Sequence, residues 1–82
     1  MDLRMIKELD TVVLTHDIAK HGLVAGDIGV VVHCFADGSA HEIEFVTAEG
    51  RTIAVLTLTL TDVRLMSGRE ILHVREVARQ PA

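Results

Sequence analysis

Aromatic side chains are nearly absent from this chain of 82 residues, which has two Phe and neither Trp nor Tyr. Grooves that bind proline-rich peptides and cages that bind methylated lysine are built from aromatic rings. The sequence therefore argues against both kinds of recognition. Its hydrophobic content, 49% of the residues, comes mainly from Val, Ile, Leu and Ala, and such a composition packs well in β-sheets.

Cys34 is the only cysteine, so the chain cannot form an intramolecular disulfide. No apolar run approaches the ~20 residues that a membrane-spanning helix needs. The N-terminal segment is charged and does not have the pattern of a signal peptide. We therefore expect a cytoplasmic protein that does not associate with membranes.

The formal net charge of −4 is unevenly distributed along the chain. Residues 1–63 have ten acidic and four basic side chains, whereas residues 64–82 have four arginines and two glutamates. Because an acidic body is unsuited to binding phosphates, the charge argues against nucleic acid as a partner. The basic C-terminal end is predicted to dock on an acidic face, either of its own chain or of a neighbour.

Short β-branched segments separated by turn residues predict an all-β fold. The expected strands are 11–15, 28–35, 40–46, 51–60 and 63–66. Five strands in so short a chain favour a small closed barrel, because closure removes exposed strand edges. We expect one β-barrel domain over residues 1–66 and a C-terminal extension over residues 67–82.

The segment 16–25 has no clear periodicity and is predicted to form a loop over one mouth of the barrel. Gly22 and Gly26 are expected to permit its turns, since glycine tolerates positive φ.

The pair Asp37-Gly38 is typical of a two-residue type I′ hairpin turn, in which both residues have positive φ. That turn would place Cys34 opposite His41 in the neighbouring strand. It would also place His33 opposite Glu42. The two members of each pair are expected to share one face of the hairpin.

Ser67 and Glu70 have the spacing of a capping box at the start of a helix. Apolar residues then recur at helical spacing before Pro81, namely Ile71, Val74 and Ala78. We predict a short helix in the extension. A sixth strand is the alternative, because Val74 and Val77 are β-branched.

Several segments of the chain follow the pattern of one known family: 8–18, 21–23, 26–31, 37–38, 42–45, 52–55 and 62–64. Together they resemble a small bacterial family, domain of unknown function 4926, over roughly residues 6–66. The resemblance implies an SH3-like barrel with no established activity, and it supplies no catalytic residues. Ala19 departs from the pattern, since proline is common there in the family. The extension from Ser67 onward lies outside the resemblance.

Five histidines and one cysteine are the composition feature that suggests metal chemistry. Thiolate and imidazole groups bind zinc or copper, but a site needs three or four ligands. No second cysteine is present, so we expect no metal and no cofactor. Cys34 is predicted to be a small buried apolar residue. Cys34, His33 and His41 remain the candidate ligands of an alternative interpretation.

His16, Asp17 and His21 provide two imidazoles and a carboxylate within one loop, which suggests a base and its orienting group. No nucleophile or glycine-lined oxyanion site accompanies them, so we expect no enzymatic activity. Asp17 is predicted to accept hydrogen bonds from the backbone. Turn capping is likewise predicted for the acidic residues at strand ends, Asp10, Asp27 and Asp62.

The remaining candidate is an interaction surface made of the apolar outer face of the second and fourth strands, an acidic row and the C-terminal extension. The candidate interface residues are Glu42, Glu44, Ile71, Val74 and Arg75. We expect a non-catalytic protein–protein interaction module that self-associates as a homo-oligomer, with any other protein partner unidentified. One alternative is an antitoxin-like or regulatory protein that caps a basic partner. The other is a small metal-binding or ligand-binding protein at the Cys34/His41 hairpin.

Overall fold

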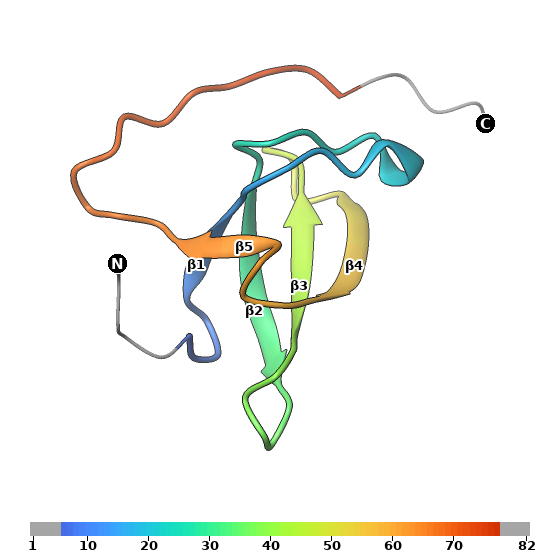
Figure 1. Ribbon diagram of the computed structural model, residues 1–82. Coiled ribbons are helices and arrows are strands. Elements are labelled where there is room, and N and C mark those ends of the chain that lie inside the picture. The colour runs from blue at the N-terminus through green and yellow to red at the C-terminus, as the bar shows by residue number, and fades with distance from the viewer. Residues whose placement is uncertain (1–5, 78–82) are drawn as a thin grey trace.

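The computed structural model describes residues 6–77, which contain one antiparallel sheet of five strands (Figure 1). The strands are β1 (Thr11–Leu14), β2 (Ile28–Cys34), β3 (His41–Val46), β4 (Thr52–Leu58) and β5 (Val63–Leu65). The predicted all-β class is confirmed, and each expected strand is present with ends shifted by at most two residues. No helix within residues 6–77 has the length and apolar character needed to cross a membrane.

The strands lie in the order β4-β3-β2-β1-β5. Strands β1 to β4 form a meander in which each pairs with the next, and β5 returns to pair with the free side of β1. Among residues 6–77 no ladder joins β4 to β5. The pairings therefore establish a five-stranded sheet, and they do not establish the predicted closed barrel.

The core lies on the inner face of this sheet. Strand β3 shows the expected alternation, because Ile43 and Phe45 are buried whereas Glu42 and Glu44 are half-exposed. The core cluster consists of Ile6, Val12, Leu14, Leu23, Val31, Ile43, Phe45, Leu58 and Val63. All of these precede residue 64, so residues 67–77 contribute no side chain to the core cluster.

The loop between β1 and β2 packs against the core through Ile18 and Leu23. It contains a single 3₁₀ turn, η1 (Ala19–His21), which Gly22 ends in the left-handed conformation at φ 70°. Ile18 and Leu23 pair across this loop through two backbone hydrogen bonds of 2.9 and 3.2 Å. Leu23 is buried and Ile18 packs against the core cluster.

The β2–β3 hairpin has the predicted register, with Cys34 opposite His41 and His33 opposite Glu42. Its turn differs from the prediction, because Gly38 has positive φ and Asp37 does not. The Gly38 N–H donates to the Phe35 carbonyl at 2.9 Å, and the Phe35 N–H donates to the Ala40 carbonyl at 3.1 Å. The loop therefore has four residues, 36–39. Both this loop and the expected two-residue loop are centred between Asp37 and Gly38. The residues that face each other across the hairpin are therefore the same in both.

No helix forms over the tail, residues 67–77, so the predicted helical extension is wrong there. Its remaining positions, from 78 onward, lie outside the described residues. Half of the capping box is present, since the Ser67 N–H donates to Glu70 Oε1 at 2.7 Å. However, Ile71 and Val74 are 86% and 99% exposed, and a short helix is unstable without a packed apolar face.

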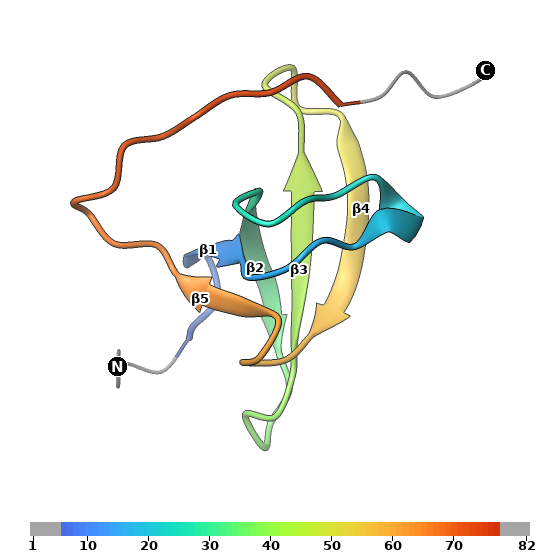
Figure 2. The same cartoon turned by 45° about the horizontal axis from the view of Figure 1, so that its top comes forward.

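The tail instead runs without regular secondary structure along one end of the sheet, where β3 ends and β2 begins (Figures 1 and 2).

Gly29 permits a close approach between β2 and the core side chains of β3. A Cβ at this position would lie 2.5 Å from Ile43 Cγ2 and 2.9 Å from Phe45 Cε1. We expect Gly29→Ala to lower the free energy of unfolding by about 1–3 kcal/mol through overpacking. Urea denaturation monitored by circular dichroism measures this change.

Gly68→Ala is the matched control, because a Cβ at Gly68 would meet no atom within 4 Å. Its effect is expected to stay within about 0.5 kcal/mol. Equal stability of the Gly29→Ala variant and the wild type would contradict the close approach.

Candidate functional site

Three aspartates close the turns before β1, β2 and β5 in the same way. The side chains of Asp10, Asp27 and Asp62 each accept a hydrogen bond from the backbone N–H three residues earlier, at 2.8, 2.9 and 2.9 Å. In return, the backbone N–H of each aspartate donates to the backbone carbonyl of the residue three positions earlier. The predicted turn-capping role of all three is confirmed.

Asp27 also binds a cation from the tail. Arg75 Nε donates to Asp27 Oδ1 at 2.8 Å, and Arg75 Nη2 donates to Asp27 Oδ2. The same Nη2 donates to the Gly22 carbonyl at 3.0 Å. Such a bidentate guanidinium–carboxylate contact pairs the two charges and also fixes the orientation of the arginine side chain. The basic C-terminal end thus docks on the acidic body of its own chain.

The Asp27 carboxylate remains ionised in this contact. Partial burial alone would raise its pKa, but hydrogen bonds from Arg75 and from the Val24 N–H outweigh burial and lower the pKa. The Asp27 side chain is 17% exposed and that of Arg75 is 35% exposed, so water screens the pair only in part.

A second ion pair holds the beginning of the tail. Arg64, on β5, donates to both carboxylate oxygens of Glu70, at 2.8 and 2.7 Å. With the Ser67 N–H as an additional donor, Arg64 lowers the pKa of Glu70 to about 2. The tail is therefore attached at Glu70 and at Arg75, and Ile71, Leu72 and Val74 lie exposed between these two attachments.

A groove of about 440 Å³ lies between the tail and the body. Its body side includes Leu23, Phe45 and Ile53, and its tail side is formed by residues 73–77. Asp27 also lines this groove. The groove thus combines an apolar floor with a bound guanidinium.

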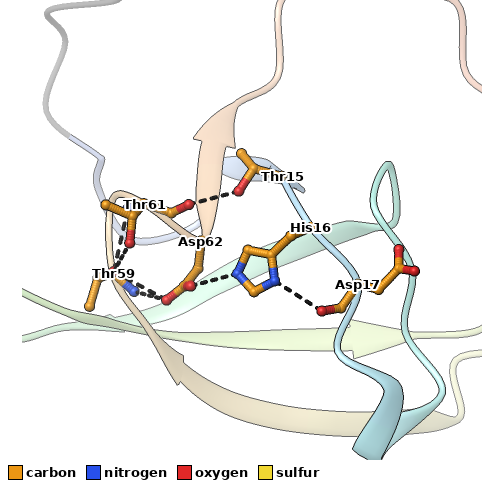
Figure 3. A network of polar contacts seen from close by, with 6 residues as sticks. All are labelled: Thr15, His16, Asp17, Thr59, Thr61 and Asp62. Atoms are coloured by element: carbon orange, nitrogen blue, oxygen red, sulfur yellow. Dashed lines mark hydrogen bonds and ion pairs between the residues drawn. The ribbon is translucent and has the colours of Figure 1, made fainter.

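Asp62, another of the three turn-closing aspartates, forms an ion pair with His16 (Figure 3). Its Nε2 lies 2.7 Å from Asp62 Oδ1, and its Nδ1 lies 2.9 Å from the Asp17 backbone carbonyl. Both ring nitrogens thus face oxygen acceptors, which only the protonated imidazolium can satisfy. The hydrogen bond to Asp62 and then that to the Asp17 carbonyl raise the pKa of His16.

The Asp17 carboxylate is not the hydrogen-bond partner of His16, whose Nδ1 lies by the Asp17 backbone carbonyl. Asp17 Oδ1 instead accepts the Ala25 N–H at 2.8 Å, in the backbone-binding role that the sequence predicted. Sequence reasoning missed Asp62 as the partner of His16, because 46 residues separate the two. Only the pairing of β1 with β5 brings them together.

The structure brings Cys34 and His41 together but not His33. His41 is buried, and its Nδ1 has no hydrogen-bond partner among the described residues. Cys34 is partly buried and donates to the Ile6 carbonyl at 3.7 Å. Burial, followed by the charges of Glu8 and Asp10, raises the pKa of its thiol.

His33 is exposed and packs edge-on against Phe35, with ring centroids 5.1 Å apart. Within residues 6–77 no three or more His, Cys, Asp or Glu side chains are grouped to hold a metal ion.

The predicted interface residues lie in two separate places. Glu42 and Glu44 project from the outer face of β3, where Glu44 accepts a hydrogen bond from Thr52 Oγ1 at 2.7 Å. Ile71, Val74 and Arg75 lie in the tail, and Arg75 pairs with Asp27 rather than with the acidic row.

Residues 8–65 match the family described as a domain of unknown function (DUF4926). The chain belongs to the DUF4926 family. Neither the curated proteins nor the solved structures give a significant match to it. The DUF4926 match includes His16, Asp27 and Asp62, whereas Glu70 and Arg75 lie beyond it.

The His16–Asp62 pair is expected to make stability depend on pH. Because the folded-state pKa of His16 is raised, the pair contributes fully below the unfolded-state pKa and its contribution is lost as pH rises through the folded-state value. The Tm of the wild type should exceed that of His16→Gln at about pH 5.5 and the difference should shrink by about pH 8.5.

Proton NMR titration provides a second measurement of this pair. The pKa of His16 should fall in the Asp62→Asn variant. A His16 pKa that is the same in both proteins would contradict the ion pair.

Proposed function

We propose that this DUF4926 protein is a non-catalytic module for protein–protein contact that associates with copies of itself. The exposed apolar segment of the tail carries this proposal. Ile71, Leu72 and Val74 present their side chains to solvent between two ion-pair attachments, with Leu72 61% exposed and the other two more so. Contiguous exposed apolar side chains usually mark an interaction surface.

The edges of the sheet support the same proposal. Among residues 6–77, β4 and β5 each pair with one strand only, so each has one side open to strand addition. We also propose that the sheet curves into the SH3-like barrel that the family resemblance implies, with the outer edges of β4 and β5 left unpaired. The meander order and a single core cluster shared by all five strands support that finer description.

Replacing apolar tail residues should weaken self-association. The double substitution Ile71→Ser and Val74→Ser is expected to shift the protein towards the monomer in size-exclusion chromatography with light scattering. Because neither side chain is part of the core, the variant should keep its fold, which circular dichroism would show.

Leu60→Ser is the matched control, since Leu60 is as exposed as Leu72 but lies in the connection between β4 and β5. It should leave the mass unchanged. A wild type that is monomeric at every concentration would refute self-association, and so would a double variant with the wild-type mass.

A second candidate function is binding of a soft metal ion or a small ligand at Cys34 and His41. It is favoured by the buried imidazole nitrogen of His41, which has no partner among the described residues although buried polar atoms are normally hydrogen-bonded. The facing Cys34 offers sulfur as a second ligand. Any further ligands would have to come from outside this pair.

Binding of metal at this pair should raise thermal stability, because a ligand selective for the folded state stabilises it. With zinc or copper(I) in excess we expect a higher Tm and a bound ion in native mass spectrometry. Both effects should disappear in Cys34→Ser. An unchanged Tm at saturating metal would eliminate this candidate.

A further inference from the structure

The loop between η1 and β2 forms a receptor for a guanidinium group, made of the Asp27 carboxylate and the Gly22 carbonyl. The body of the protein holds this receptor in place. The Asp27 side chain accepts the Val24 N–H, and backbone hydrogen bonds of 2.9 Å join Leu14 of β1 to Gly26 and Asp27. The receptor is therefore part of the domain, independently of what occupies it.

The segment that fills the receptor is weakly attached. Residues 71–77 make no backbone–backbone hydrogen bond within the described part of the chain, and every residue of the tail is exposed. Among the described residues beyond Glu70, the polar link between the tail and the body is the Arg75 side chain. Release of one guanidinium would thus free this segment without loss of core contacts.

We propose that the receptor takes Arg75 from the tail of a second copy, so that two copies exchange their tails. This inference rests on the proposed self-association and names the contact that produces it. A two-fold exchange repeats one contact twice and closes on itself, as in domain swapping.

Three properties of the tail support this occupant. The stretch from Met66 to Arg75 reaches about 30 Å when extended, enough to cross to a neighbouring domain. The arginine-rich C-terminal end complements the acidic body. Ile71, Leu72 and Val74, which are exposed when the tail folds back on its own chain, would lie between the two bodies after exchange.

Two variants that each lose one half of the contact test the exchange. Arg75→Ala removes the guanidinium and leaves the receptor intact. Asp27→Asn removes the carboxylate charge but keeps an oxygen that can accept the Val24 N–H. Neither variant alone can form the contact, whether within a chain or between chains, so neither gains it on dimerisation.

An equimolar mixture of the two variants separates exchange from contact within one chain. In the mixture, Arg75 of the Asp27→Asn chain can enter the intact receptor of the Arg75→Ala chain. The mixed dimer should therefore form about tenfold more tightly than either homodimer, measured by energy transfer between N-terminal labels. If the contact forms only within a chain, mixing restores nothing.

Arg69→Ala is the control for the loss of an arginine from the same tail, and it should leave association unchanged. Circular dichroism checks that Asp27→Asn is folded. A wild type that associates while the mixture behaves like the single variants would overturn the exchange and leave self-association standing. A wild type that is monomeric at every concentration would overturn both.

Discussion

The C-terminal end of β1 organises the polar features of this protein. Leu14 makes backbone hydrogen bonds to the loop residues Gly26 and Asp27, and the Thr15 N–H donates to the Asp62 carbonyl at 2.9 Å. Because β1 lies between β2 and β5, these bonds hold the two acidic turns on either side of one short strand. The positions of both ion-paired aspartates thus follow from the pairing of β1.

Local signals in the sequence predicted the local structure well. The strands, the glycine-containing loop and the three turn-closing aspartates depend on residues close together in the chain, and all are present. The hairpin register was also predictable, because the loop of residues 36–39 has the same centre as the expected turn. That register correctly placed Cys34 beside His41.

The partners of the aspartates could not be predicted in the same way. Asp27 and Arg75 are 48 residues apart, and His16 and Asp62 are 46 apart, so only the folded sheet shows these pairs. Charge distribution predicted that the C-terminal end docks on an acidic face, but it did not identify Asp27 as the residue that binds it. The helix prediction was wrong because Ser67 and Glu70 favour the first turn of a helix, while the residues that follow bury no apolar face.

Asp27 has two roles, since it accepts a hydrogen bond from its own turn and another from the tail. The turn is shaped by the hydrogen bond from the Val24 N–H to Asp27 and by the backbone hydrogen bonds of Leu14, and all of these residues lie within the DUF4926 match. Arg75, which binds the Asp27 carboxylate, lies outside that match. The domain therefore has an attachment point that exists before any extension is added. A substitution at position 75 alone would therefore remove the docked guanidinium without altering the loop that binds it.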